Sequence, residues 1–288
     1  MASFILGACT RAPPAVGPSP LQVSALQQDP ISSRAFESHA VFDVADSAMY
    51  FVRSSPAFQG WRLQVSECRD GVWSEPRAPT FAGEGLEADP YIVDGGRSLY
   101  FISTRAYQGK AGADLDIWVT RRANATTPWG EPERLPAPVN SDGAEWFPRP
   151  GPDGWLYFGS DRAGGLGGTD IYRARQRAGV WTVENLGSAV NSGADEYEAE
   201  VSPDGSHMVM MADGDIFMLR RTASGWAART KLGAEVNTPA LEVGPTFSPT
   251  GRTILFARDF GTATLPIGGS GEFVVARIDT SEAWPPCS

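Results

Sequence analysis

Five glutamates recur along this chain, each at the start of a strand-like run, and carboxylates in such a pattern could bind a cation. They lie 50, 58, 51 and 46 residues apart, at Glu37, Glu87, Glu145, Glu196 and Glu242. Spacings of this size are typical of repeated supersecondary units. If the units close into a ring, the glutamates would form a ring of carboxylates. Calcium is the first cation to expect there, because it accepts six to eight oxygen ligands in irregular geometry.

The neighbours of the glutamates suggest further chemistry, because side chains alternate between the two faces of an extended strand. Two residues after each glutamate come His39, Asp89, Phe147, Glu198 and Gly244. Four residues after come Val41, Tyr91, Arg149, Glu200 and Thr246. If the protein is an enzyme, a bound cation would activate water and His39, Asp89 or Glu198 would be the base. Tyr91, Arg149 and Glu200 are the predicted ligand-binding residues, while the residues one after each glutamate are assigned to blade packing.

The glutamates also have a purely structural interpretation. Carboxylates crowded together repel one another unless they are solvated or paired with cations. Arginines recur after the second strand-like run of four units, at Arg53, Arg105, Arg162 and Arg258. Ion pairs between these arginines and the glutamates would make the column part of the fold instead of a site.

The elements that must position these residues are short antiparallel strands. Apolar and polar residues alternate in runs rich in Tyr, Phe, Val, Ile and Trp, and Pro-Asp-Gly turns separate the runs. Four strands in each of five units predict an all-β, five-bladed β-propeller. A β-sandwich is the other all-β arrangement, but it does not need fivefold repetition. One tryptophan also recurs per unit, at Trp73, Trp129, Trp181, Trp226 and Trp284.

The two ends of the chain are predicted to close the ring. In units two to four a leucine lies ten residues before the next glutamate, whereas the last unit ends just after Trp284. Leu26 lies eleven residues before Glu37. We therefore expect residues 21–28 to supply the outer strand of the C-terminal blade, since an open blade edge invites aggregation.

The segment GPDGWLYFGSDRAGGLGGTDIY (151–172) combines a Pro-Asp-Gly turn, Leu-Tyr-Phe-x-Ser-x-Arg, a Gly-rich loop and Asp-Ile-Tyr. This pattern resembles the WD-like repeats of TolB-type propellers, which are common in bacterial envelope proteins. The resemblance covers nearly the whole chain after residue 20. It implies the propeller fold and an envelope-associated binding or scaffold role, although the same scaffold also serves enzymes. An acidic residue before the Pro-Asp-Gly turn is common in this family.

The topology of a blade predicts which face carries the site. Adjacent strands are antiparallel, so the start of the first strand and the loop between the second and third strands share one face. The long loops of this kind are residues 104–115, 161–169 and 257–271. We expect the binding site at the channel mouth on that face, because concave mouths with convergent polar groups are typical sites.

The N-terminus and the cysteines suggest an envelope location. Leu6-Gly7-Ala8-Cys9 resembles a bacterial lipobox, so residues 1–20 would form a Pro-rich tether before a propeller domain of residues 21–288. Cys9 would then anchor a periplasmic or outer-membrane lipoprotein. The apolar run is short and no Lys or Arg precedes it, so an accidental match is the alternative. Cys68 and Cys287 could pair in an oxidising periplasm or remain two thiols.

The composition limits the classes of binding partner to expect. A net charge of −10 excludes nucleic-acid binding, which requires a basic surface. No apolar stretch is long enough to span a membrane, and neither Gly-x-Ser-x-Gly nor His-Glu-x-x-His occurs. We expect a monomer that binds a small molecule, peptide or protein at the acidic mouth. The alternative is a calcium-dependent hydrolase of lactones, esters or phosphotriesters.

Overall fold

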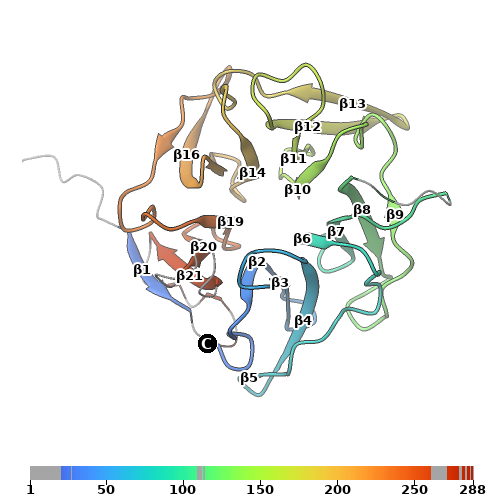
Figure 1. Ribbon diagram of the computed structural model, residues 1–288, viewed down its shortest axis with the longest axis vertical. Coiled ribbons are helices and arrows are strands. Elements are labelled where there is room, and N and C mark those ends of the chain that lie inside the picture. Colours follow the sequence, from blue (N-terminus) through green and yellow to red (C-terminus); the bar gives the residue numbers. More distant parts are fainter. Residues whose placement is uncertain are drawn as a thin grey trace, which may run out of the picture.

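The chain forms five small antiparallel sheets arranged in a ring, as Figure 1 shows. The computed structural model describes residues 21–26, 28–108, 112, 114–260, 271–278, 281–282, 284–285 and 287. Within these residues there are strands, turns and loops but no helix. The predicted five-bladed β-propeller with four strands per blade is confirmed.

The first three blades follow one another along the chain. Blade one contains β2 (Phe36–Asp43), β3 (Ala48–Ser54), β4 (Arg62–Arg69) and β5 (Val72–Trp73). Blade two contains β6 (Glu87–Val93), β7 (Ser98–Ser103), β8 (Asp116–Arg121) and β9 (Glu133–Arg134). Blade three contains β10 (Glu145–Pro150), β11 (Leu156–Ser160), β12 (Asp170–Arg177) and β13 (Val180–Asn185).

The last two blades depart slightly from this plan. Blade four contains β14 (Glu196–Val201), β15 (His207–Ala212), β16 (Asp215–Thr222) and β17 (Gly225–Trp226), and β18 (Thr230–Lys231) also pairs with β16. Blade five contains β19 (Glu242–Phe247), β20 (Thr253–Asp259), β21 (Gly271–Arg277) and the N-terminal β1 (Gln22–Ala25).

The core lies between neighbouring blades. The second strand of each blade is buried on both faces, and its central residue is fully buried: Phe51, Phe101, Phe158, Met210 and Phe256. Burying a side chain of this size stabilises the fold by about 1.5–3 kcal/mol. The turns that lead into these strands contain glycines with positive φ at Gly154, Gly205 and Gly251, a conformation that favours glycine.

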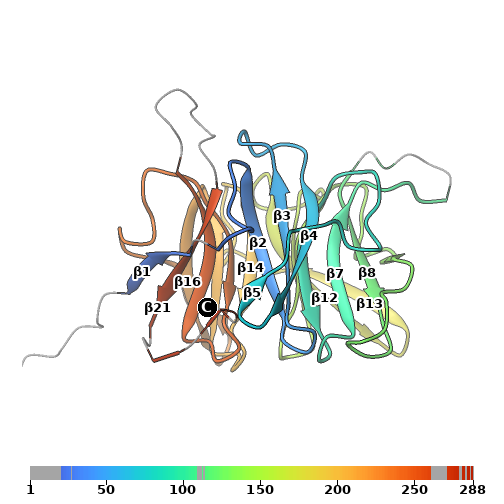
Figure 2. The ribbon, with the colours of Figure 1, turned by 90° about the horizontal axis from the view of Figure 1, so that it is seen from below.

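The ring is closed by both ends of the chain. β1 pairs with β21 from Gln22↔Arg277 to Ala25↔Val274, which confirms the predicted outer strand, and Figure 2 shows the two strands side by side. A disulfide also joins Cys68 on β4 to Cys287, with the two Cα atoms 6.0 Å apart. The C-terminus is therefore fixed to blade one, while Cys9 lies outside the described residues.

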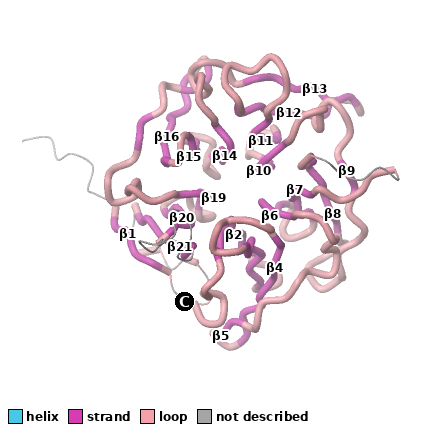
Figure 3. The backbone as a smooth tube through the Cα atoms, viewed as in Figure 1, coloured by secondary structure: helices cyan, strands magenta, loops and turns pink. Residues whose placement is uncertain are grey.

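No described part of the chain forms a helix long and apolar enough to cross a bilayer. The channel is bordered by the first strand of each blade, β2, β6, β10, β14 and β19, which lie innermost in Figure 3.

Candidate ligand pocket at the channel mouth

Each of the five repeat glutamates is completely buried and bonded within its own blade. The partner is an arginine in every case: Glu37–Arg53, Glu87–Arg105, Glu145–Arg162, Glu196–Arg229 and Glu242–Arg258. Four of these arginines were predicted. In blade four the end of β15 holds Ala212 and no arginine, and Arg229, which lies between β17 and β18, pairs with Glu196 instead. We call each pair, together with the hydroxyl groups bonded to it, a glutamate cell.

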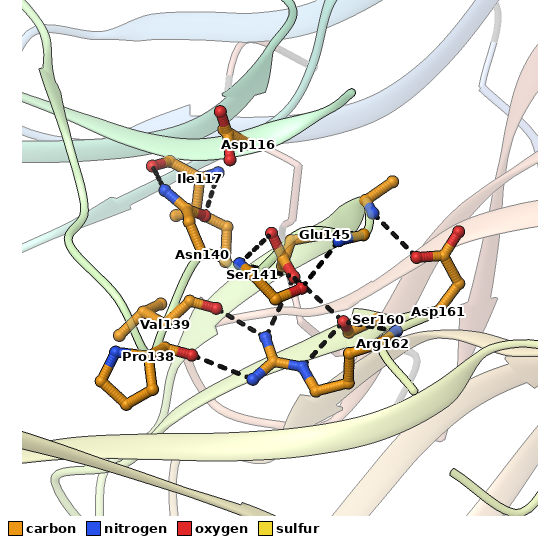
Figure 4. A network of polar contacts seen from close by, with 12 residues as sticks. Asp116, Ile117, Pro138, Val139, Asn140, Ser141, Glu145, Ser160, Asp161 and Arg162 are labelled. Atoms are coloured by element: carbon orange, nitrogen blue, oxygen red, sulfur yellow. Dashed lines mark hydrogen bonds and ion pairs between the residues drawn. The ribbon is translucent and has the colours of Figure 1, made fainter. Parts of the chain in front are cut away.

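Figure 4 shows the cell of blade three. The Ser141 hydroxyl donates to Glu145 Oε1 at 2.5 Å, the Ser160 hydroxyl at 3.0 Å and Arg162 Nη2 at 3.0 Å. Arg162 also donates to the carbonyls of Pro138 and Val139. Burial raises the pKa of Glu145, although these donors favour its ionised form. The carboxylate thus ties the loop before β10 to β10 and to the end of β11.

The same arrangement recurs around the ring. A serine or threonine four residues before the glutamate donates its hydroxyl in blades one, three, four and five, and the Gly83 N–H donates in blade two. Among the described residues, no group of three or more His, Cys, Asp or Glu side chains could hold a metal ion. The glutamates therefore do not fit the calcium site expected of them, because arginine, hydroxyl and backbone N–H donors already bond to each carboxylate. Among these oxygens Glu87 Oε2 has no hydrogen-bond partner.

The first strands contain a β-bulge directly after the glutamate. The pairing register shifts between Ser38 and Val41 in β2 and at the equivalent position in blades two, three and five. In blade four the shift comes earlier, between Glu196 and Glu198. In four blades the bulge residue has a left-handed backbone: φ is 51° at His39, 56° at Asp89, 51° at Phe147 and 66° at Gly244. Non-glycine residues held in this conformation store backbone strain, which is typical of functional sites.

The bulge also explains why three blades have a proline three residues after the repeat glutamate. Pro90, Pro148 and Pro245 each follow a bulge residue, where the ladder needs no N–H donor. At Gly244 a side chain would also be crowded, because a Cβ atom would lie 3.0 Å from the backbone nitrogen of His39.

The side chains two residues after the repeat glutamate converge in the channel from three blades. His39 Nε2 lies 2.8 Å from Glu198 Oε1 and 3.4 Å from Asp89 Oδ1. The other oxygens accept backbone N–H groups of the following blade: Asp89 Oδ2 from Phe147 at 2.8 Å and Glu198 Oε2 from Gly244 at 2.6 Å. The three residues predicted as catalytic are thus adjacent, and one network connects all five blades. We call His39, Asp89 and Glu198 the floor.

Proton affinity at the floor is altered by burial and by its neighbours. Burial opposes the charged imidazole, but Asp89, Glu198 and the hydrogen bond to Glu198 outweigh it, so the pKa of His39 is raised. Burial is also the largest effect on Asp89 and raises the pKa of its carboxyl, against the attraction of His39 and Arg149. Titratable groups with shifted pKa values that share a cleft are typical of functional sites.

The predicted ligand-binding residues lie one layer deeper. Arg149 Nε donates to Glu200 Oε2 at 3.2 Å, and its guanidinium stacks 4.6 Å from the Tyr91 ring centroid. Glu200 also accepts the Phe247 N–H at 2.9 Å, and burial raises the pKa of its carboxyl. None of the three lines the pocket above the floor. Tyr91 and Glu200 instead line a cavity of about 140 Å³ on the opposite side.

A pocket of about 350 Å³ lies above the floor, on the predicted face. Two aromatic pairs form part of its wall. Phe58 and Trp61 come from the loop between β3 and β4, whereas Trp146 and Tyr197 come from the starts of β10 and β14. The remaining lining is aliphatic, from Val52, Ala88, Ile102, Met211, Leu241 and Val243.

Two expectations about this wall need correction. Ala88, Trp146, Tyr197 and Val243, which were assigned to blade packing, also line the pocket, because the innermost strand exposes its edge to the channel. The long Gly-rich loops contribute none of their described residues. The loop between β3 and β4 replaces them, since Trp61 is held over the mouth by its indole N–H, which donates to the Phe58 carbonyl at 2.9 Å.

Sequence reasoning missed Phe58, Trp61, Trp146, Tyr197 and Leu241 as site residues. A usable signal was present for two of them. Five of the nine tryptophans belong to the once-per-unit column, and Trp61 and Trp146 are among the four that do not. An aromatic residue outside the repeat pattern has no packing position to fill in the other blades, so it is a candidate for a site.

The comparisons with known proteins support the fold. No family model matches the chain, and no curated protein matches it. A solved family 117 glycoside hydrolase from Zobellia galactanivorans has a TM-score of 0.57 at 14% identity, covering 91% of this chain and 92% of that one. A protein assigned as TolB from Agrobacterium tumefaciens has a TM-score of 0.50 at 15% identity, covering 78% and 71%.

A carbohydrate-active enzyme of family AA12 from Trichoderma reesei has a TM-score of 0.50 at 10% identity, and covers 96% of this chain and 100% of its own. Identities this low show a shared fold and nothing more specific. The chain is thus a five-bladed β-propeller with an aromatic pocket at one channel mouth. Its membership of the TolB-type family stays a prediction.

Proposed function

We propose that this protein is a ligand-binding propeller that holds a small organic molecule in the pocket above His39, Asp89 and Glu198. The observation that carries the proposal is the convergence of four aromatic side chains and three buried titratable groups on one concave site. Pockets with apolar walls and a few polar groups at one end are the usual form of small-molecule sites.

The walls are preformed, which favours binding. The Trp61 indole N–H is bonded to the Phe58 carbonyl at 2.9 Å. Trp146 and Tyr197 stack edge to face, with ring centroids 5.6 Å apart. Side chains that are already fixed lose little rotamer freedom when a ligand arrives, so more of the contact energy appears as affinity.

The pocket size favours a small molecule over a folded protein partner. A cavity of about 350 Å³ is near the lower end of the range for small-molecule sites, roughly 300–1,000 Å³. A peptide could enter only by a single side chain or terminus. We further propose an envelope location, because the Cys68–Cys287 disulfide is of a kind that persists in oxidising compartments.

A hydrolase that uses the floor is the second candidate. It is favoured by the approach of two carboxylates to the same imidazole nitrogen, within 2.8 and 3.4 Å. Asp89 or Glu198 could accept a proton from water while His39 donates one to the leaving group. We rank ligand binding ahead of catalysis, because three of the four carboxylate oxygens of Asp89 and Glu198 already accept a hydrogen bond from within the protein.

The test is binding of a small-molecule library to the whole chain, measured as a shift in Tm and by ligand-observed NMR. The library contains cationic, anionic and neutral ring compounds and saccharides. Leu241→Trp fills the pocket rim, and Trp155→Leu serves as a control because Trp155 is half-buried outside the pocket. We expect hits that bind the wild type and the control but not Leu241→Trp. Hits that bind all three proteins equally would exclude this pocket.

The hydrolase is tested separately with chromogenic esters, lactones, phosphotriesters and glycosides. Turnover that disappears in Asp89→Asn and Glu198→Gln, with both variants folded, would favour catalysis. A wild-type rate equal to that of buffer would remove the second candidate.

A further inference from the structure

We propose that the ligand carries a compact organic cation, of the quaternary or tertiary ammonium class, which binds between the aromatic walls above the acidic floor. This inference rests on the ligand-binding function proposed above and names the chemical class of the ligand. It is carried by the placement of the aromatic rings, the sign of the charge that lines the pocket, and the state of the polar atoms at its floor.

The aromatic rings lie on opposite sides of the mouth. Phe58 and Trp61, with centroids 5.5 Å apart, belong to blade one. Trp146 and Tyr197 belong to blades three and four, and in a ring of five this junction lies opposite blade one (Figure 1). A cation between the two pairs would have aromatic rings on both sides. A cation within about 6 Å of a ring centroid is attracted by the ring quadrupole, most strongly by that of Trp.

The charges that line the pocket have one predominant sign. Its described lining contains two carboxylates, one imidazole and no Arg or Lys. Below the floor, Arg149 pairs with Glu200 at 3.2 Å, so its positive charge, which also acts on His39 and Asp89, is partly offset. At the rim, Asp195 and Asp161 add negative charge beside the Tyr197 hydroxyl. The net charge of −10 extends this field beyond the pocket, so cations are attracted and anions are repelled.

The hydrogen bonds of the floor distinguish an ammonium ion from a sugar. A saccharide needs directional donors and acceptors, but Asp89 Oδ2 and both Glu198 oxygens already accept hydrogen bonds from Phe147, His39 and Gly244. His39 Nδ1 is likewise bonded to the Ser38 hydroxyl at 2.8 Å. A quaternary ammonium has no N–H and needs no free acceptor. It requires a negative field and aromatic rings around it, and the pocket contains both.

The test compares two molecules of nearly equal shape that differ in charge. Choline and its uncharged isostere 3,3-dimethylbutan-1-ol are titrated into the whole chain by calorimetry. We expect choline to bind at least about tenfold more tightly than the neutral compound, as cation–π attraction in a partly desolvated site requires. Trp61→Leu should raise the Kd of choline about tenfold, while Trp155→Leu, the matched tryptophan outside the pocket, should leave it unchanged.

A charge-removing variant completes the design. Glu198→Gln keeps the shape and should weaken choline more than dimethylbutanol. Because Glu198 bonds to two other blades, a melting curve must first show that the Glu198→Gln variant is folded. If it does not fold, the comparison of choline with its neutral isostere alone tests the charge. Trp146→Leu then tests the opposite aromatic wall, since Trp146 lies at the wall and not in the network.

The outcomes distinguish a failure of the cationic-ligand inference from a failure of the proposed binding function. Equal affinity for both compounds, lost together in Leu241→Trp, would overturn the cationic ligand and keep the binding pocket. Binding of glucose or benzoate in place of choline would do the same. Choline that binds Leu241→Trp as well as the wild type would overturn the inference by placing the cation elsewhere. No binding of any library compound in the pocket would overturn the inference and the proposed function together.

Discussion

The glutamate cells and the floor are both buried clusters of charge, but they are built in opposite ways. The five cells repeat the same chemistry, a fully buried carboxylate with an arginine of its own blade. The floor lies two residues further along the same strands and repeats nothing, because that position holds His39, Asp89, Phe147, Glu198 and Gly244. A residue that every blade keeps serves what every blade needs, which is to hold its strands together. A position that differs in every blade can serve something that the ring does only once.

The two regions also differ in what they connect. The hydrogen bonds and the ion pair of a glutamate cell stay within one blade, so their loss would loosen one loop and two strands. The floor joins blade one to blades two and four, and the carboxylates reach the backbone of blades three and five. The following predictions test this division between a structural and a functional region.

The largest loss of stability should follow from opening a cell. Glu145→Ala leaves the Arg162 guanidinium, whose side chain is 14% exposed, without its counter-charge. Removing one partner of a buried pair costs about 3–5 kcal/mol. We expect that loss in urea unfolding, with ligand affinity in the surviving folded protein unchanged. The control is Glu133→Ala, whose exposed pair with Arg121 should contribute at most about 1 kcal/mol. Equal effects of the two variants would contradict the structural role of the cells.

The next effect concerns ring closure. The Cys68–Cys287 disulfide spans 219 residues of chain, and a crosslink of this kind typically contributes about 2–4 kcal/mol. Cys68→Ser should therefore unfold at lower urea concentration than the wild type. Adding a reductant to the wild type should reproduce the shift, and adding it to Cys68→Ser should do nothing. β1 still pairs with β21 in the variant, so the propeller should form. An unchanged midpoint in reducing buffer would show that the pair does not stabilise the ring.

A smaller effect, confined to one pH range, is expected at the floor. The pKa of His39 is raised from its ordinary value of 6.5, chiefly because the attraction of Asp89 and Glu198 exceeds the effect of burial. The folded protein therefore binds this proton more tightly than the unfolded chain. The stabilisation is complete below pH 6.5 and is lost as pH rises through the folded-state pKa. The raised pKa values of Asp89 and Glu200 act in the same direction from lower pH.

The measurement is the free energy of unfolding from about pH 6 to about pH 9, where histidine titrates. His39→Gln should flatten the decline in this range. His207→Gln, which changes the other histidine at an exposed position, should leave the decline as it is in the wild type. Parallel curves for the wild type and His39→Gln would refute the charged floor.

The same division between repeated and unrepeated residues explains which features could be predicted from the sequence. Periodic features were predictable, because each was seen several times: the blades, four of the five arginine partners and the closing strand at residues 21–28. The convergence of His39, Asp89 and Glu198 also followed, since equivalent positions of a ring must meet at its axis. The bulge did not follow. Its left-handed residues disrupt simple alternation, so the glutamates are bonded within their blades and the floor residues are directed into the channel.

The pocket wall was unpredictable for a different reason. Phe58 and Trp61 lie in a loop whose sequence does not match those of the equivalent loops in the other units, so the repeat does not indicate how it folds. Trp146 and Tyr197 occupy the position next to the glutamate, where a large aromatic could equally pack between blades. Only the three-dimensional arrangement shows that the rings meet over the floor. The residues of the pocket wall therefore depart from the repeat pattern, and a prediction that follows the repeats alone does not find them.

The smallest expected change in stability is also the sharpest test of this division. Trp61→Leu keeps an apolar side chain against Phe58 and loses the indole hydrogen bond to the Phe58 carbonyl, which is worth about 1 kcal/mol. It should therefore unfold only slightly before the wild type, yet bind pocket ligands about tenfold more weakly. Trp155→Leu removes a tryptophan that contacts Arg173 and Arg175, so it should cost similar stability without affecting affinity. If both variants lose stability and neither loses affinity, the pocket wall belongs with the glutamate cells, and the functional region must be sought elsewhere on the ring.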